Sequence, residues 1–399
     1  MKNVVRYALI GAGNQGTYYA NELLHKGLIE NAKLVVVCDK NQAKIERIKN
    51  VLNDPSIKYV EDYREILDAS LVDAILIETP HYDHPQIAID AFKKGINVLC
   101  DKPAGVYTRQ VKEMNLEAEK HNVLFTMMFN QRTNSLYKKV KEMIEQNILG
   151  KLQRVTWIIT DWFRTEKYYA SGEWRATWNK EGGGVLINQC PHQLDLLLWL
   201  INKKVKSVRA FCEYGKFHDI EVEDDATAII EFEDGLTGTF IASTGEFPGT
   251  NRLEISGTKG KILIDSNLDS KLLFFKNEKD AMEYSKEAKE AFPIIKSEKE
   301  ENITDGTNPQ HIEILRNFTQ AILGKEKLFV DGKEGIKQVE LMNAIELSGW
   351  NDGEKISLPI DEDRYYKELM NHAMTSKKKS SNDEILDGIT NSFGAINKK

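Results

Sequence analysis

Two short segments of the chain carry side chains that can move a proton. One of them is Asp101-Lys102-Pro103, which follows the apolar run INVLC. A lysine just past the carboxyl end of a parallel strand lies where open α/β sheets bind their ligands, so Lys102 is a candidate proton carrier. The alternative reading is a surface lysine that precedes a turn proline.

The second segment is GGGVLINQCPHQLDLLLWL at residues 182–200. If one helix spans it, Asn188, His192 and Asp195 share a face and the leucines occupy the other, which predicts a polar cleft above a core. His192 is then the natural acid/base and Asn188 its neighbour. Each residue also has a purely structural alternative. Asn188 could cap a helix, since Pro191 suits a first helical turn, His192 could be a core histidine, and Asp195 could serve a structural role.

Residues 160–184 are rich in Trp, Tyr and Arg. Aromatic faces stack on sugar rings, and arginine donates a fork of hydrogen bonds to hydroxyls or carboxylates. An aromatic domain or dimer contact would give the same composition. We predict a substrate-binding set made of Arg164, Tyr168, Trp174, Arg175, Asn188 and His192.

A glycine-rich turn, Gly11-Ala-Gly13-Asn-Gln-Gly16, follows the first apolar run and opens a helix-period segment. In that position the first glycine makes the turn, the second lets a pyrophosphate approach, and the third lets helix and strand pack closely. Asp39 ends the second predicted strand, where a carboxylate binds the ribose hydroxyls and repels a 2′-phosphate. The pattern predicts NAD, with NADP the weaker choice.

Cations beside Asp39 leave some room for NADP, because Lys40 and Arg47 could screen its extra phosphate. His81 and His84 have a metal-like spacing but no third ligand at a recognisable offset, so we predict no metal and expect His84 near the cofactor. The predicted cofactor-binding residues are Gly11, Gly13, Asn14, Gln15, Gly16, Asp39, Lys40, Thr79, Pro80, His84, Asp101, Lys102 and Asn130.

Continuous apolar runs alternate with amphipathic segments up to about Met128, which predicts a doubly wound parallel sheet in a first domain of residues 1–129. Two-residue alternation then predicts a second α/β domain, residues 130–372, with a large, mostly antiparallel sheet. Its lysine- and glutamate-rich segment 276–302 is expected to be a solvated excursion, and residues 373–399 a polar tail.

Composition narrows the classes of partner. A formal net charge of -7 gives no basic field for nucleic acid, and we expect neither a signal peptide nor a membrane span. The four cysteines lack paired spacing and are expected to be buried free thiols. These features favour a cytoplasmic protein that acts on a small molecule.

Five motifs in order, GAGNQG, Glu78 to His84, DKP at 101–103, NQR at 130–132 and the glycine-to-aspartate run at 182–195, resemble the glucose-fructose oxidoreductase/inositol dehydrogenase (Gfo/Idh/MocA) family. The resemblance covers roughly residues 5–370. It implies an open C-terminal sheet that often mediates homodimers or homotetramers. It also implies that Lys102 is the lysine of an E-K-P motif, often followed by a cis proline, and that His192 is the acid/base.

Two positions depart from that pattern: Asp101 replaces the usual Glu, and Asn188 replaces an Asp. Asn188 can orient a hydroxyl but cannot carry a proton, so the acid/base work moves to His192 and Lys102. We therefore expect hydride transfer between NAD and a CH–OH or ketone carbon of a sugar, glycoside or cyclic polyol. The rivals are an NAD-dependent glycosidase or lyase with transient oxidation, and a cofactor-sensing regulator without catalysis.

Overall fold

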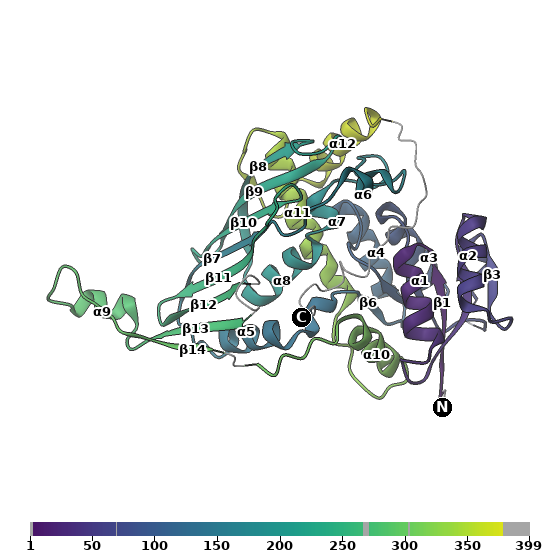
Figure 1. Ribbon diagram of the computed structural model, residues 1–399, viewed down its shortest axis with the longest axis horizontal. Helices are drawn as coiled ribbons and strands as arrows, with labels where there is room; N and C mark the ends of the chain where they lie inside the picture. Colours follow the sequence, from purple (N-terminus) through teal and green to yellow (C-terminus); the bar gives the residue numbers. More distant parts are fainter. Residues whose placement is uncertain (1–2, 69, 266–270, 302–303, 378–399) are drawn as a thin grey trace. The chain divides into compact units, whose positions relative to one another are not determined.

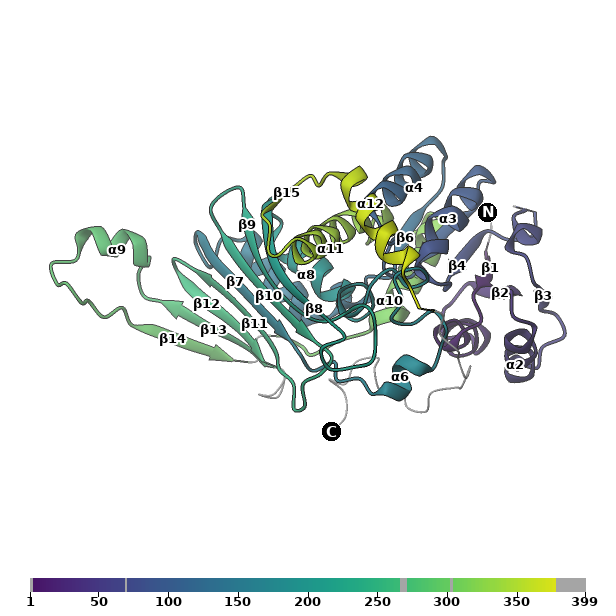
Figure 2. The same ribbon diagram turned by 90° about the horizontal axis from the view of Figure 1, so that it is seen from above.

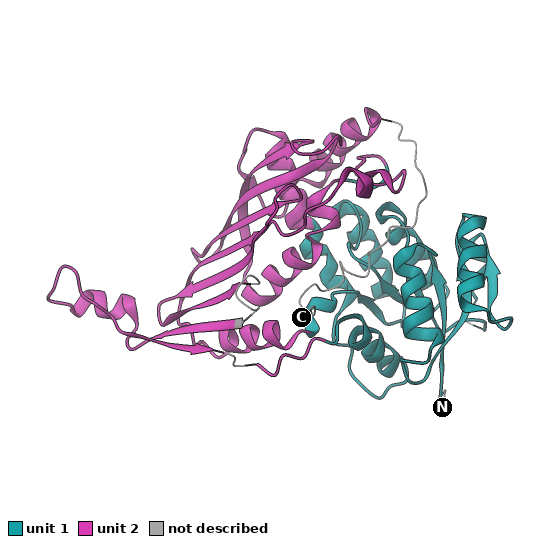
Figure 3. Ribbon diagram, viewed as in Figure 1, with its two compact units in different colours: residues 1–133, 180–182, 309–339 teal, residues 134–179, 183–308, 340–399 magenta. Residues whose placement is uncertain are grey.

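The computed structural model describes residues 3–68, 70–265, 271–301 and 304–377, and these form two compact units (Figure 3). Unit 1 contains residues 1–133, 180–182 and 309–339, and unit 2 contains residues 134–179, 183–308 and 340–399. The predicted boundary at residue 129 lies close to the end of the first segment. Residues 309–339 also belong to unit 1, whereas the sequence prediction placed them in the second domain.

Unit 1 is built on a six-stranded parallel sheet of order β3-β2-β1-β4-β5-β6, the doubly wound arrangement that the sequence predicts. Its strands are apolar along their length because helices cover both faces, and β1 and β4 are almost wholly buried. The strands are β1 (Val5–Ile10), β2 (Ala32–Cys38), β3 (Lys58–Val60), β4 (Ala74–Ile77), β5 (Asn97–Cys100) and β6 (Phe125–Met127).

The helices of unit 1 alternate with these strands (Figure 1). They are α1 (Asn14–Tyr18), which continues as a π-helical segment (Tyr19–His25), α2 (Gln42–Leu52), α3 (His84–Lys93), α4 (Thr108–Lys120) and α10 (Gln310–Ile322). Helix α10 is fixed on the sheet because the Tyr7 hydroxyl lies 2.8 Å from Thr319 Oγ1. Gly27 and Gly95 have φ values of +71° and +70° just past helix ends, as the sequence predicts.

Unit 2 contains a nine-stranded mixed sheet of order β14-β13-β12-β11-β7-β10-β9-β8-β15. Neighbouring strands are antiparallel except β7 and β10, which run parallel. The strands are β7 (Leu152–Ile159), β8 (Val205–Tyr214), β9 (Glu223–Phe232), β10 (Thr237–Ser243), β11 (Asn251–Gly257), β12 (Gly260–Asp265), β13 (Lys271–Asn277), β14 (Ser297–Glu301) and β15 (Ile356–Ser357). The large, mostly antiparallel sheet predicted for the second domain is therefore confirmed.

Helices α8 and α11 lie along one face of this sheet (Figure 2), and α5 packs on the same core through Tyr137 against Trp157 of β7, with ring centroids 6.1 Å apart. The side chains of alternate residues point to the other face, where Phe211 and Ile229 are exposed. The helices of unit 2 are α5 (Ser135–Glu145), α6 (Glu166–Ala170), α7 (Val185–Asn188), α8 (Pro191–Ile201), α9 (Ala281–Glu287), α11 (Gly335–Trp350), which begins in unit 1, and α12 (Glu362–Met374).

The charged segment 276–302 is exposed along its described part, but it is more ordered than a simple excursion. Strands β13 and β14 pair antiparallel around α9, so the segment extends the sheet at its edge. Of the predicted tail, Ala373 and Met374 complete α12, and Lys377 N donates to Glu221 Oε2 at 2.9 Å. The remainder, 378–399, lies outside the described residues.

All four cysteines are free thiols. Cys38, Cys100 and Cys190 are buried as predicted, whereas Cys212 is only partly buried, which corrects the prediction for that residue. In the described part of the chain, no helix has the length and apolar character that crossing a membrane requires.

Candidate active site

The glycine turn of unit 1 has the geometry of a dinucleotide-binding loop. A Cβ on Gly11 would lie 2.4 Å from Glu78 O, and one on Gly16 would lie 1.9 Å from Gly11 O, so both positions demand glycine. A Cβ on Gly13 would meet nothing within 4 Å. The first and third glycines thus let the turn pack on the sheet, and the second leaves a bare backbone surface at the start of α1, which Asn14 and Gln15 open.

Asp39 lies next to this turn, directly after β2. Its Oδ2 accepts a hydrogen bond from Ala12 N at 2.7 Å, and its Oδ1 accepts one from Asn41 N at 2.8 Å. Each carboxylate oxygen keeps a second lone pair that can accept from a ribose hydroxyl. Arg47 donates to Ala12 O at 2.9 Å, so its guanidinium is tied to the same turn.

Lys40 is more remote from the turn, because its side chain is 80% exposed and its Nζ lies 3.6 Å from Asp83. Two polar atoms near the strand ends, Gln15 Oε1 and Thr79 Oγ1, are shielded from solvent and have no hydrogen-bond partner in the described residues. A bare glycine surface, a ribose-binding carboxylate and unused polar atoms together fit a bound dinucleotide.

Backbone hydrogen bonds hold the ends of the central strands side by side. Glu78 N donates to Ile10 O at 2.8 Å, and Asp101 N donates to Ile77 O at 3.0 Å. Lys102 therefore follows the strand end next to the glycine turn, partly buried, and its peptide bond to Pro103 is cis. Its backbone N–H donates to Asp101 Oδ1 at 2.9 Å.

Glu78 also lies at these strand ends, next to Asp101. In the sequence it belongs to a family motif, but no role was predicted for it. Burial and the adjacent Asp101 carboxylate raise the pKa of Glu78 well above its usual value, so its carboxyl group holds a proton. A protonated carboxyl group can donate a hydrogen bond to Asp101. A glutamate at a strand end gave no local signal of this burial.

His84 ties together the two loops that follow β4 and β5. Its Nε2 lies 2.8 Å from Thr79 O and its Nδ1 lies 2.8 Å from Pro103 O. The ring is buried, and it contacts the carbonyl oxygens of the Pro103-Ala104 and Thr79-Pro80 peptides. The neighbouring His81 has its Nδ1 3.0 Å from Glu181 O. In the described part of the chain, no cluster of three His, Cys, Asp or Glu side chains is arranged for a metal.

Asn130 is buried, and its amide group faces α10. Its Nδ2 lies 3.0 Å from His311 Nε2 and 3.3 Å from Gln310 Oε1. Burial and the charge of Lys102 lower the pKa of His311 to about 4, so the imidazole is neutral at physiological pH. His311 was not predicted, because only the fold brings residues 309–339 to this edge of the sheet.

In unit 2, residues 182–200 do not form the single helix that was predicted. Helix α7 ends at Asn188, and α8 begins at Pro191. The i, i+4 argument for Asn188 and His192 was therefore wrong: the chain breaks at Gln189 and Cys190, because a proline favours the first turn of a new helix and disfavours a helical residue before it.

The capping alternative for Asn188 is not what the structure shows, since Cys190 occupies the cap position of α8. Asn188 and His192 are both half-buried, and His192 lies in the first turn of α8. Asp195, one turn further along, is buried.

Tyr168 of α6 connects most of the predicted substrate-binding residues. Its hydroxyl donates to Asn188 Oδ1 at 3.5 Å and accepts from Arg175 Nη1 at 2.8 Å. Gln189, which was not predicted, donates to the same hydroxyl from Nε2 at 3.1 Å. The guanidinium carbon of Arg175 lies 4.4 Å from the Tyr168 ring centroid and 4.7 Å from that of Trp174.

A buried glutamate, Glu223, supports the helix that ends in Asn188, and a second, Glu346, interacts with Glu223. Glu223 Oε1 accepts hydrogen bonds from Gly184 N at 2.8 Å and Leu186 N at 3.0 Å, which satisfies the first turn of α7. Glu346 also accepts from the Tyr365 hydroxyl. Burial and the neighbouring Glu223 charge raise the pKa of Glu346 well above its usual value, so one of the two carboxyl groups stays neutral.

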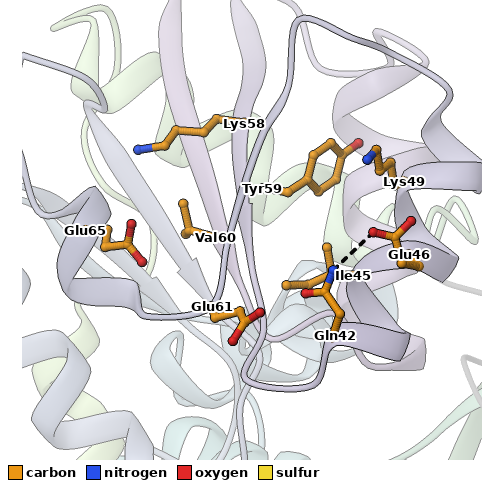
Figure 4. A pocket seen from close by; sticks show the side chains of 9 residues that line it. All are labelled: Gln42, Ile45, Glu46, Lys49, Lys58, Tyr59, Val60, Glu61 and Glu65. Carbon is orange, nitrogen blue, oxygen red and sulfur yellow. Dashed lines mark hydrogen bonds between the residues drawn. The ribbon is translucent and has the colours of Figure 1, made fainter.

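A separate hollow of about 510 Å³ lies between α2 and the edge strand β3 (Figure 4). Its lining contains three glutamates and two lysines, and Gln42 donates to Glu46 at 3.1 Å along the α2 side of the hollow. None of the predicted site residues lines it. The predicted site residues lie instead in the two groups described above, one in each unit.

Comparison with known proteins agrees with this division. Residues 5–129 match the model of an oxidoreductase family with an NAD-binding Rossmann fold, and residues 137–263 match the GFO/IDH/MocA C-terminal domain. Myo-inositol 2-dehydrogenase of Thermotoga maritima is 26% identical over 269 residues, which cover 66% of this chain and 75% of the relative. The NAD(+)-dependent scyllo-inositol 2-dehydrogenase of Bacillus subtilis is 28% identical over 273 residues, 66% of this chain and 75% of the relative.

Among solved structures, the WlbA dehydrogenase from Bordetella pertussis, in complex with NADH and UDP-GlcNAcA, superposes with a TM-score of 0.73 at 25% identity. The match covers 90% of this chain and 100% of that one. Both halves of the chain are thus accounted for by one architecture.

Proposed function

Because the chain belongs to the Gfo/Idh/MocA family of NAD-binding oxidoreductases, we propose that it moves a hydride between NAD and a carbon-bound hydroxyl of a sugar, glycoside or cyclic polyol. The observation that carries this proposal is the joint presence of the glycine turn with Asp39 and of Lys102 on the adjacent strand end. Relatives named as inositol dehydrogenases support the choice of a polyol or sugar.

In the oxidative direction, His192 accepts the proton of the substrate hydroxyl, and Lys102 donates a hydrogen bond to the same oxygen as negative charge develops there. NAD supplies the hydride acceptor when it is bound. Asn188 orients the substrate through its amide and takes no proton. Its contact with Tyr168 supports this role, because the phenol fixes the amide beside the predicted substrate-binding residues.

The remaining cofactor contacts are part of the same proposal. Thr79, Pro80, His84 and Asp101 shape the loops on which the nicotinamide half would rest, and Asn14 and Gln15 present the start of α1 to the phosphates. Asn130 acts from a buried position through His311. The proposed division into a cofactor domain, 1–129, and a substrate domain, 130–372, follows the same assignment.

We further propose that the open face of the unit 2 sheet is a homodimer or homotetramer interface. Phe211 is 67% exposed and Ile229 is 53% exposed on that face, which is costly in water. Free cysteines at all four positions favour a reducing compartment, consistent with the proposed cytoplasmic location.

The direct test is to incubate the purified protein with NAD or NADP and a panel of inositols, aldoses and glycosides, and to follow reduced nicotinamide by absorbance. We expect reduction of NAD by at least one member. Release of a hydrolysed or eliminated product without net NADH would instead indicate a glycosidase or lyase. Tight NADH binding with no conversion of any member would indicate a regulator.

A further inference from the structure

Arg164 is held rigidly at the end of β10 by its own backbone. Its N–H donates to Thr244 O at 3.0 Å, and its carbonyl oxygen lies 3.0 Å from His218 Nε2. His218 is in turn fixed by Asp224, whose Oδ2 lies 3.1 Å from His218 Nδ1, and both side chains are buried. The backbone that carries the Arg164 side chain is therefore fixed by hydrogen bonds on both sides.

The guanidinium of Arg164 is oriented by aromatic rings and not by a carboxylate. Its central carbon lies 5.2 Å from the Trp162 ring centroid and 5.1 Å from that of Tyr168. Its Nη1 donates to the carbonyl oxygens of Trp162 at 3.3 Å and Phe163 at 3.0 Å. Its Nε is shielded from solvent and has no hydrogen-bond partner.

In the described part of the chain, no carboxylate forms an ion pair with Arg164. Five other arginines form ion pairs at distances between 2.6 and 3.5 Å, namely Arg6, Arg132, Arg252, Arg316 and Arg364. Arg47 and Arg209, like Arg164, donate instead to backbone carbonyl oxygens. The carboxylate of Asp161 attracts this guanidinium without pairing with it directly. A partly buried guanidinium that has no direct carboxylate partner keeps donors from which an anionic ligand can accept.

The position of this guanidinium connects it to the proposed chemistry. Tyr168, whose ring Arg164 contacts, hydrogen-bonds to Asn188 and also holds the guanidinium of Arg175. Two guanidinium groups thus converge on one phenol beside a residue proposed to orient the substrate. Guanidinium groups only donate, and their planar fork matches the two oxygens of a carboxylate or phosphate. A neutral polyol, which must both donate and accept, would not require such a pair.

We propose that the substrate is an anionic sugar or polyol, and that Arg164 binds its oxyanion group while Arg175 holds Tyr168 in place. This inference rests on the proposed hydride transfer and narrows its substrate class. The shared chemistry is a carboxylate or phosphate on the sugar, with the fork geometry favouring the carboxylate of a sugar acid.

The test compares matched pairs on the wild-type protein with saturating NAD: D-glucose with D-glucuronate, D-galactose with D-galacturonate, and D-glucose with D-glucose 6-phosphate. We expect kcat/KM to be higher for the anionic member of at least one pair by about tenfold to a hundredfold, the usual range for a charge-assisted hydrogen bond. Comparison of the uronate pairs with the glucose 6-phosphate pair shows whether a carboxylate or a phosphate is preferred.

Arg164→Gln should abolish this preference, so that kcat/KM of the anionic member falls to that of the neutral member, and Arg164→Lys should restore part of the preference because the charge remains. Lys167→Gln is the matched control: it removes a positive charge from the exposed surface of α6, the helix that carries Tyr168, and should leave the preference intact.

Binding of the same sugars to the NADH-loaded protein, measured by calorimetry, separates the two proposals. If no sugar is turned over but D-glucuronate binds more tightly than D-glucose in an Arg164-dependent way, the hydride-transfer proposal fails and the anion site stands. If neutral and anionic members of every pair are bound and turned over equally well, or if Arg164→Gln preserves the preference, the anion site is wrong.

Discussion

Gly13 offers the sharpest separation between binding the cofactor and keeping the fold. An alanine Cβ there would meet no heavy atom of the protein within 4 Å, and the residue has φ of -67°, which any L-residue adopts. The cofactor-free protein should therefore be unaffected by Gly13→Ala, or gain up to about 1 kcal/mol from the stiffer unfolded chain. The same methyl group would occupy the surface where the pyrophosphate approaches the backbone.

Loss of charge-assisted hydrogen bonds from the α1 N-terminus would cost about 1.5–3 kcal/mol, so NADH affinity should fall about tenfold to a hundredfold. Fluorescence titration with NADH measures this, and thermal unfolding without cofactor measures the fold. Gly16→Ala is the contrasting variant, because its Cβ would lie 1.9 Å from Gly11 O. It should lower Tm even without cofactor, since overpacking costs about 1–3 kcal/mol. Unchanged NADH affinity in Gly13→Ala would refute the assignment of this loop.

Three further outcomes are expected. Wild-type protein should prefer NAD over NADP by about tenfold to a few hundredfold in kcat/KM, and Asp39→Asn should narrow that ratio. Equal use of both cofactors by the wild type would show that the cations Lys40 or Arg47 outweigh the Asp39 carboxylate. Ile229→Glu on the open sheet face should lower the mass measured by light scattering toward that of the 45.5 kDa monomer. A wild-type protein that is monomeric at micromolar concentration would contradict the proposed interface. The pKa of Glu346 is higher in the folded than in the unfolded protein, so its contribution to stability is present below the unfolded pKa and is lost as pH rises through the folded pKa. Between these two pKa values the free energy of unfolding should fall by up to about 1.4 kcal/mol per pH unit. Urea unfolding should show a shallower decline for Glu346→Gln than for the wild type, and parallel curves would contradict the prediction.

The features predicted well from sequence are those whose cause is local. The glycine turn follows β1 directly, and its Gly16 packs closely on Gly11 within the same turn. The alternation of β9 and β10 shows directly which face of the sheet is buried. The Lys102 position follows from the end of an apolar strand in the same way.

The errors and omissions come from interactions that no local pattern contains. A helix-period pattern runs through residues 182–200, yet Pro191 starts a new helix, and the break decides how Asn188 is presented. His311 reaches Asn130 only because residues 309–339 return to unit 1. The proton on Glu346 depends on the nearby Glu223, which is distant in sequence.

The central claim is that Lys102 and His192 act on one substrate oxygen, and a double-mutant cycle on the best substrate tests it most directly. Lys102→Ala and His192→Ala should each lower kcat by about 10² to 10⁴ with NADH affinity nearly unchanged, because their interactions strengthen only as charge develops. Asn188→Ala should cost about tenfold in kcat/KM, and Asn188→Asp should be tolerated. We predict that the Lys102/His192 double variant loses clearly less than the product of the two single losses; near-wild-type turnover in His192→Ala, or fully multiplicative losses, would contradict the account.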